Sequence, residues 1–314
     1  MAKKHAPYFR RRAPIRPSYL PKIKTGKKQT GFEQGQLLLE RLSAEDIDLY
    51  TETETKLKAY YLDEYYYYVA ERAKRSIQIT EALSKKTSKF DFQDHYRCVH
   101  TQYNDRPLSS AGSRISAVGG RFNFGRINDF FPTFPALYIG EDARVARLEM
   151  RQTDEQKPKQ ISFEEFKGIS VSDYRVHGVL NNILDITDTD NLKPFLKVIA
   201  KIEVSPLLSD EAIRVGLTST NPISTMRELS NALLHPNWRL SVTRFSIPSN
   251  SQSFGNLVKA AKIEGIKYKS KFRTGSCLAI FPENLGPGSF IQLSDKAATN
   301  VVTILDSNTY PGLI

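Results

Sequence analysis

The spacing of apolar and polar positions divides the chain into a helical first part and a strand-rich second part. Residues 45–86 contain neither glycine nor proline and place apolar side chains at helical intervals, which predicts one long helix or two consecutive helices. The preceding Ser43-Ala44-Glu45-Asp46 is typical of an N-cap with an acidic first turn. We expect another short helix at residues 34–42 and a connector at residues 87–95.

Short apolar runs separated by polar turns predict strands in the rest of the chain. They lie at residues 137–140, within 161–186, at 266–268 and at 277–281, with a strand-rich tail to residue 314. Helices are expected at residues 188–202, 210–234 and 253–262, the last of them ended by Gly265, whereas residues 101–134 are loop-like. Separate runs of helices and strands indicate an α+β fold.

Six tyrosines surround most of the predicted helix between residues 60 and 68. Their rings must therefore lie partly against another surface, and tyrosine suits half-wet interfaces because its hydroxyl stays hydrogen-bonded. Two interpretations stay open. The helix packs on the rest of this chain, or it contacts a second copy or a partner.

The net charge of +11 belongs to one end of the chain. Residues 1–30 hold ten basic residues and no acidic one, whereas the other 284 carry 35 basic and 34 acidic residues. We expect this proline-containing basic arm to be flexible. It suits contact with nucleic acid, an acidic partner or an anionic membrane, and a solubilising role is the alternative.

Several classes of protein are disfavoured by composition. Two cysteines, Cys98 and Cys277, build neither a disulfide framework nor a four-cysteine zinc site. No apolar run approaches the ~18 residues of a membrane helix, and the basic N-terminus has no apolar signal-peptide core. We therefore expect a cytoplasmic protein without a transmembrane segment or a metal site.

Glu149 is the leading candidate for chemistry. On a helix over residues 141–151, Arg144, Arg147 and Arg151 share one face, and Glu149 points to the opposite, apolar side. A carboxylate on such a face must be hydrogen-bonded, paired or functional. A structural ion pair with a buried arginine is the alternative.

Two arginines beside flexible loops are candidate anion-binding groups. Arg97 follows Tyr96 at the head of a predicted strand, and Arg121 stands in Gly119-Gly120-Arg121-Phe122-Asn123. A planar guanidinium binds two oxygens of a phosphate at once, and glycines let the backbone approach a ligand closely. A plain turn is the alternative for the glycines, because this spacing matches neither a Walker loop nor a Rossmann fingerprint.

The remaining candidates also have structural interpretations. Tyr138, in the strand before the helix of Glu149, suits stacking or hydrogen bonding to a ligand, or a place in the core. His95 and His100 lack metal-ligand spacing and are interpreted as structural or rim residues. Ser249 at a helix start suits an N-cap, and no spacing indicates an acyl-transfer triad.

These motifs together resemble the RES domain family, which is named for its Arg, Glu and Ser. The likeness rests on Tyr96-Arg97, the Gly-Gly-Arg-aromatic-Asn string, the Leu-Tyr-Ile strand, Glu149 and the Leu-Asp-Ile pattern at residues 184–186. It continues in Ser249-x-x-Gln252 and the later Gly-Ile-Lys-Tyr-Lys-Ser270 strand. Some relatives carry an aromatic residue where Cys98 follows Arg97. Ser270 is a second candidate for the family serine.

The resemblance implies an ADP-ribosyltransferase-like split sheet and an enzyme that consumes NAD as substrate, without a further cofactor. By that likeness Arg97, Glu149 and Ser249 are catalytic. Tyr96, Arg121, Asn123, Tyr138, Gln252 and Ser270 contact the dinucleotide. Many members are bacterial toxins held by a cognate antitoxin, often one with a helix-turn-helix domain. Cleavage would use water or inorganic phosphate as acceptor.

The predicted organisation is a basic arm at residues 1–30, a helical region at 31–90 and a catalytic domain at 91–314 with a helical insertion at about 190–240. Residues 31–90 could dock on the enzyme, on a partner or on a second copy in a homo-oligomer. Two other functions stay open. One is a protein mono-ADP-ribosyltransferase that uses the same pocket, and the other is a nucleic-acid-binding protein that acts through its arm.

Overall fold

The computed structural model describes residues 43–151, 170–217, 222–271, 275–295 and 298–313. They belong to two compact units, each made of two segments of the chain. The first comprises the chain up to Ala70 together with Ile202–Pro222. The second comprises Glu71–Lys201 together with the chain from Ile223 onward. The basic arm, the expected helix at 34–42 and part of the expected strand region at 161–186 lie outside the described residues.

The first unit contains most of helix α2 (Ala44–Lys74) and helix α7 (Pro206–Arg214). The predicted N-cap is confirmed, because Ser43 Oγ accepts from Asp46 N and Asp46 Oδ2 accepts from Ser43 N, both at 3.1 Å. Of the six tyrosines, Tyr60 and Tyr61 are buried, and the Tyr67 hydroxyl donates to Glu203 O at 2.7 Å.

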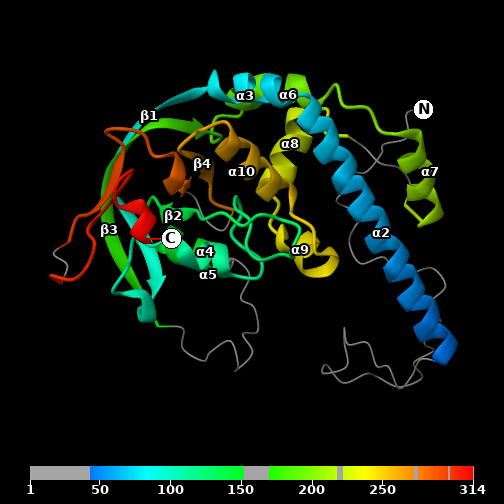
Figure 1. The fold of residues 1–314 in the computed structure, drawn as a ribbon, viewed down its shortest axis with the longest axis horizontal. Coiled ribbons are helices and arrows are strands. Elements are labelled where there is room, and N and C mark those ends of the chain that lie inside the picture. The colour runs from blue at the N-terminus through cyan, green and yellow to red at the C-terminus, as the bar shows by residue number, and fades with distance from the viewer. Residues whose placement is uncertain (1–42, 152–169, 218–221, 272–274, 296–297, 314) are drawn as a thin grey trace. The chain divides into compact units, whose positions relative to one another are not determined.

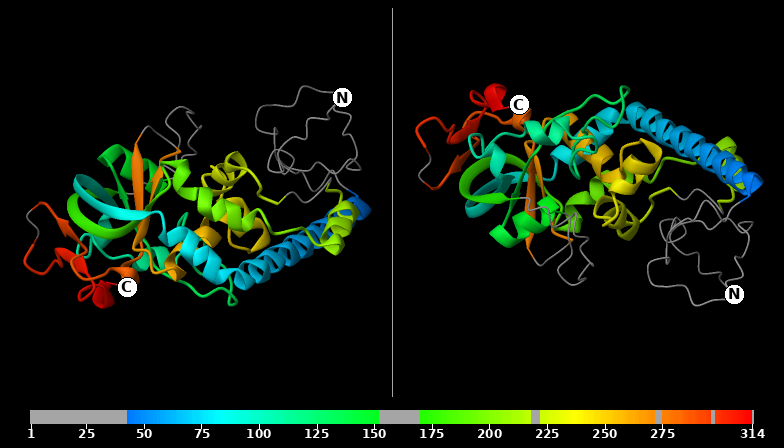
Figure 2. Two further views of the ribbon diagram at one scale, coloured as in Figure 1. Left: turned by 90° about the horizontal axis from the view of Figure 1, so that it is seen from above. Right: turned by 90° about the horizontal axis from the view of Figure 1, so that it is seen from below.

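A seven-stranded sheet forms the centre of the second unit, in the order β1-β2-β5-β4-β3-β6-β7 (Figure 1). Its strands are β1 (Thr87–His100), β2 (Leu137–Gly140), β3 (Val171–Asp185), β4 (Gly265–Lys269), β5 (Ser276–Ile280), β6 (Phe290–Leu293) and β7 (Ile304–Asp306). β1 pairs antiparallel with β3 from Thr87↔Leu184 to His100↔Val171, in addition to its pairing with β2. The first five strands in the order therefore close on themselves, and they curve strongly (Figures 1 and 2).

The expectation of a connector at residues 87–95 is wrong, because β1 begins at Thr87. The register shifts between Ser88 and Phe90 and again between Phe92 and His95, and Asp94 has φ 52°. These irregularities interrupt the alternation of apolar and polar side chains by which a strand is recognised from its sequence.

The other predicted strands are confirmed to within a residue or two at their ends where they are described, and β2 covers the expected residues 137–140. The helices of this unit are α3 (Ser76–Ser84), α4 (Ala111–Ile115), α5 (Ala143–Arg151), α6 (Lys193–Ile199), α8 (Met226–Leu233), α9 (Arg239–Phe245) and α10 (Asn250–Ala260). Short 3-10 turns lie at Thr101–Tyr103, Thr189–Leu192, Pro282–Asn284 and Tyr310–Leu313. α10 begins three residues before the expected 253, directly after Ser249.

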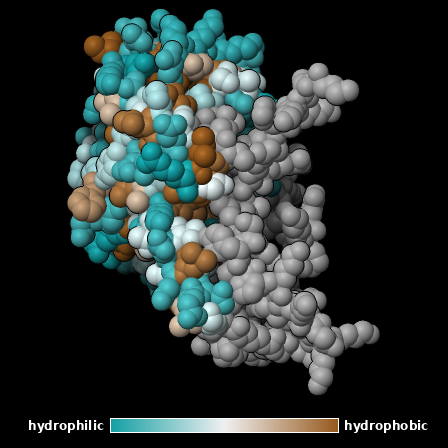
Figure 3. All heavy atoms as spheres, turned by 90° about the vertical axis from the view of Figure 1, so that its right-hand side faces the viewer, coloured by the Kyte–Doolittle hydropathy of each residue, from teal (hydrophilic) through white to brown (hydrophobic). Residues whose placement is uncertain are grey.

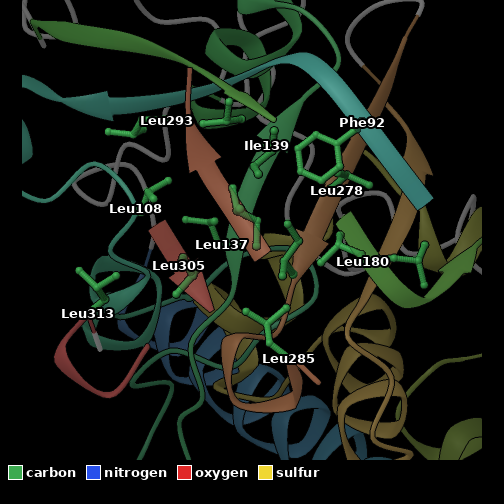
Figure 4. Packing of buried hydrophobic residues seen from close by; sticks show 14 residues of the cluster. Phe92, Leu108, Leu137, Ile139, Leu180, Leu278, Leu285, Leu293, Leu305 and Leu313 are labelled. Carbon is green, nitrogen blue, oxygen red and sulfur yellow. The ribbon is translucent and has the colours of Figure 1, made fainter. Parts of the chain in front are cut away.

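The core of the second unit lies against the curved sheet (Figure 4). Phe92, Leu137, Ile139, Leu180 and Leu278 are all buried and come from four different strands. The helix α5 packs on β1, β2 and β5, and α10 packs on β4, α3 and α8. The packing of α5 holds it against strands that line the cavity described below.

None of the described helices combines the length and the apolar content that crossing a membrane requires. One face of the molecule shows several hydrophobic residues among hydrophilic ones (Figure 3).

Candidate functional site

The glycine loop at residues 119–125 is held in shape by the buried amide of Asn123. Its Oδ1 accepts from Gly120 N and from the Tyr138 hydroxyl, both at 2.9 Å. Its Nδ2 donates to Ser113 O at 3.0 Å and to Phe134 O at 2.9 Å. Because these bonds use the whole amide, Asn123 organises the loop and does not line the cavity behind which it lies.

A second buried amide, that of Gln252, fixes the same loop from α10. Its Nε2 donates to Val118 O at 2.7 Å, Gly120 O at 3.1 Å and Asn123 O at 3.0 Å. Its Oε1 accepts from Ser249 N at 3.0 Å, and Ser249 Oγ accepts from Gln252 N at 3.3 Å, which completes a capping box. The structure thus places Ser249 and Gln252 under the loop, and neither side chain lines the cavity.

Two positions of the loop require glycine, each for a different steric reason. Gly119 has φ +78°, in the region that favours glycine. A Cβ on Gly120 would lie 2.3 Å from the Tyr138 hydroxyl oxygen, so only glycine lets the ring reach Phe122 N, from which its hydroxyl accepts at 2.9 Å.

A cavity of about 430 Å³ opens between this loop, strands β1 and β2, helix α5 and the start of α9. Its volume lies within the range of pockets that bind small molecules. Among its described lining residues are three arginines, Arg97, Arg121 and Arg239, against one carboxylate, that of Glu149. The aromatic side chains of Tyr103, Tyr138, Trp238 and Tyr268 line it as well.

Glu149 lies on the inner face of α5, as its helical position predicts. It is 8% exposed, Val145 and Ala146 beside it are buried, and Arg144 and Arg147 on the opposite face are exposed. The side chain of Arg151 lies outside the described residues. Ser270, at the end of β4, donates its hydroxyl to Glu149 Oε1 at 2.8 Å. Ser270 does not line the cavity itself, but its hydrogen bond orients the Glu149 carboxylate, which does.

Arg97 lines the same cavity, and each of its three guanidinium nitrogens donates a hydrogen bond to the protein. Nη1 donates to Tyr138 O at 3.0 Å, Nη2 to Ser109 O at 3.3 Å and Nε to Pro107 O at 3.4 Å. Burial lowers the pKa of Arg97 to about 10, so the group stays charged at neutral pH. Arg97 thus brings a positive charge to the cavity wall and ties β1 to β2 and to the following loop.

Arg121, in contrast to Arg97, has a described hydrogen-bond partner for only one of its three guanidinium nitrogens. The residue is 2% exposed, and Nη1 donates to His235 O at 2.9 Å. Nε and Nη2 are buried and have no hydrogen-bond partner among the residues that the structure describes. Buried donors are ordinarily satisfied, so two unpaired nitrogens of a charged group at a cavity wall indicate a place for an anionic ligand.

The sequence reasoning missed Trp238 and Arg239. Trp238, the only tryptophan of the chain, is 4% exposed, and the guanidinium carbons of Arg121 and Arg239 lie 5.9 and 5.1 Å from its ring centre. Arg239 is exposed at the rim. Partial removal from water and repulsion by Arg121 lower its pKa. The only local signal for these two residues is that a tryptophan and an arginine are adjacent in the sequence.

Two other candidates have different places. Tyr96 pairs with Gly140 and Arg175 in the sheet but does not line the cavity, whereas His100 does. His95 lies outside it and contacts the Phe92 ring. Within the described ranges, no group of three or more His, Cys, Asp or Glu side chains is arranged to hold a metal ion.

The cavity wall keeps its acidic hydroxyl and thiol groups neutral. Burial raises the pKa of Tyr138 and of Tyr268, where the charge of Glu149 adds to the effect. Burial raises the pKa of Cys98 to about 12, with a hydrogen bond to Asp173 as the next cause, and it also raises that of Cys277. The formal charges of the described wall are therefore those of three arginines and one carboxylate, which favours a ligand of net negative charge.

Comparison with known proteins gives one family. The model of the RES domain family matches residues 94–291. Among solved structures, the Mycobacterium tuberculosis MbcT–MbcA toxin–antitoxin complex contains a chain that is 15% identical to this one. The alignment covers 75% of this chain and 96% of the other, with a TM-score of 0.38. No curated protein matches the chain.

Proposed function

Because the chain belongs to the RES domain family, we propose that it is an NAD-consuming enzyme that cleaves the bond between nicotinamide and ribose. The substrate would lie in the cavity, with its diphosphate toward the arginines and its nicotinamide ribose toward Glu149. We also propose that the closed sheet, whose strands β1 and β2 line the cavity, is ADP-ribosyltransferase-like.

The observation that carries the proposal is the pairing of two buried groups at one cavity. Arg121 presents two unpaired guanidinium nitrogens, and Glu149 presents a carboxylate held at 2.8 Å by Ser270. A dinucleotide needs both: a cation for its diphosphate and an acid for the ribose, whose bond to nicotinamide breaks through a cation-like state.

The chemical step follows from the charges. The electron pair of the C1′–N bond goes to the nicotinamide ring nitrogen, which becomes neutral, and positive charge develops on the ribose. The Glu149 carboxylate would stabilise that charge and accept hydrogen bonds from the ribose hydroxyls. Water adding at C1′ loses a proton and gives ADP-ribose, whereas inorganic phosphate gives ADP-ribose phosphate.

The neutral hydroxyls of Tyr138 and Tyr268 suit the nicotinamide side of the cavity. Their raised pKa values keep them as uncharged aromatic walls at physiological pH. The Tyr138 ring is held by Asn123 and by Phe122 N, so its orientation is set before a ligand binds. A fixed ring beside a planar heterocycle favours stacking.

As partner we propose a cognate antitoxin, since many members of the family are toxins held in this way. For a toxin of this kind we propose a cytoplasmic location. Two further proposals concern residues outside the cavity. The basic arm would contact nucleic acid or an acidic partner, and residues 31–90 would contact a second copy in a homo-oligomer.

The decisive experiment follows NAD and its products in the presence and absence of inorganic phosphate. We expect the native chain to consume NAD and to release nicotinamide. Glu149→Gln should retain its fold and lose about 10²- to 10³-fold in turnover, the usual effect of removing one electrostatic transition-state group. Glu283→Gln is the control, because that carboxylate lies on the surface and pairs with Lys259 at 2.9 Å.

The products identify the acceptor. Free ADP-ribose from labelled NAD indicates hydrolysis, its phosphate ester indicates phosphorolysis, and label on protein indicates a mono-ADP-ribosyltransferase. Full activity in Glu149→Gln would refute the assignment of the site. Activity that disappears with residues 1–30 would instead favour the arm as the functional part.

A further inference from the structure

The rim of the cavity has a second cationic group that the family motifs do not include. Arg239 begins α9, follows Trp238 directly and lines the cavity. Its guanidinium carbon lies 5.1 Å from the Trp238 ring centre, and that of Arg121 lies 5.9 Å from the same centre. Trp238 is thus a shared platform for two guanidinium groups, one buried and one at the rim.

The chain supplies no carboxylate for this pair among its described ion pairs. The ion pairs of the described residues involve other basic groups, such as Arg147 with Asp173 and Arg175 with Asp295. Burial and repulsion by Arg121 lower the pKa of Arg239, and the charge of Glu149 offsets this only in part. Two like charges brought together beside two unpaired donors are relieved when an anion lies between them.

Arg97 does not provide the same contact. Its three nitrogens already donate to the carbonyl oxygens of Tyr138, Ser109 and Pro107. Nη1 and Nη2 each keep one further N–H, but turning the guanidinium toward a ligand would weaken these three bonds. Arg121, with two nitrogens that have no described partner, and Arg239 at the rim are therefore better placed than Arg97 to bind an anion directly.

We propose that Arg121 and Arg239, oriented by Trp238, form the diphosphate grip of the cavity, with Arg239 as a binding residue contributed by α9. The inference rests on the proposed function for the identity of the ligand, a nucleoside diphosphate. Arg97 is then a positioning residue for β2 and the loop at residues 107–109. Specificity for a phosphorylated ligand resides at the end of the cavity where α9 begins.

The test is calorimetric titration with ADP-ribose, a ligand that the proposed reaction does not consume. We expect Arg239→Gln to weaken binding about tenfold, the loss of one charge-assisted contact at a partly exposed position. Arg239→Lys keeps the charge and should recover part of the affinity. Emission from Trp238, the only tryptophan, should change on binding in the native protein.

Arg227→Gln on α8 is the matched control, because this arginine is exposed and does not line the cavity. Its affinity should equal that of the native protein. Thermal unfolding of Arg239→Gln should be unchanged; an unfolding temperature lowered together with the affinity would assign the residue a structural role and overturn the inference.

The two proposals can fail separately. Equal affinity of Arg239→Gln and the native protein for ADP-ribose overturns the grip and leaves NAD cleavage standing. Lysine no better than glutamine at position 239 overturns the charge-based role. If the native protein does not bind ADP-ribose but binds inorganic pyrophosphate, and Arg239→Gln weakens that binding, the diphosphate grip is supported and the dinucleotide substrate is refuted.

Discussion

Replacing Asn123 by alanine tests whether the glycine loop depends on one buried amide. The side chain is fully buried and makes four hydrogen bonds of 2.9–3.0 Å, to Gly120 N, the Tyr138 hydroxyl, Ser113 O and Phe134 O. At about 1 kcal/mol net for each bond, the variant should lose about 4 kcal/mol of unfolding free energy. For a unit of this size that corresponds to a decrease in Tm of about 10 °C.

The assay is urea unfolding followed by tryptophan fluorescence. Trp238 is the only tryptophan and lies in the unit that contains the cavity, so its emission follows that unit. Asn128→Ala is the control, because this half-buried amide donates once to Ser246 O at 2.9 Å and accepts once from Phe130 N at 2.8 Å. It should lose about 1–2 kcal/mol. If Asn123→Ala loses no more than this control, the loop is not held as we infer.

Three shorter predictions concern Ser270, Ser249 and Cys98. Ser270→Ala removes the hydrogen bond to Glu149, so turnover of NAD should decrease about tenfold while unfolding free energy changes little; unchanged kinetics would contradict an orienting role. Ser249→Ala removes an N-cap and should cost about 1 kcal/mol in urea unfolding, and a loss of turnover as large as that of Glu149→Gln would instead make this serine catalytic. Burial keeps the pKa of Cys98 at about 12 against an ordinary 9.0. Between these values the unfolded chain binds fewer protons, so stability should decrease as pH rises, and less steeply in Cys98→Ala; equal slopes in the two proteins would refute this.

The local parts of the site could be predicted from the sequence. An inward Glu149 follows from helix geometry and the flanking arginines, and the cap at Ser249 follows from its place before an apolar run. The strand at residues 137–140 is a short continuous apolar run, and its length favours a buried strand over a helix. Each of these features is decided within a few residues of the chain.

Features that depend on distant contacts could not be predicted. Arg121 and Trp238 are more than a hundred positions apart, and only the packing of α9 near the glycine loop brings them to one cavity. Asn123 and Gln252 were expected to contact a ligand, since polar residues in a family motif suggest binding. Their hydrogen bonds show instead that they hold the loop from behind. The strand at residues 87–95 was missed because its two register shifts hide the alternation.

The central claim is that Arg121 binds the dinucleotide while Glu149 assists the breaking of its glycosidic bond. Steady-state kinetics of NAD cleavage for Arg121→Gln and Glu149→Gln separate these two roles most directly. We predict that Arg121→Gln raises KM with a smaller change in kcat, and that Glu149→Gln lowers kcat with KM nearly unchanged. The opposite division, or a native protein that releases no nicotinamide from NAD, would contradict the claim.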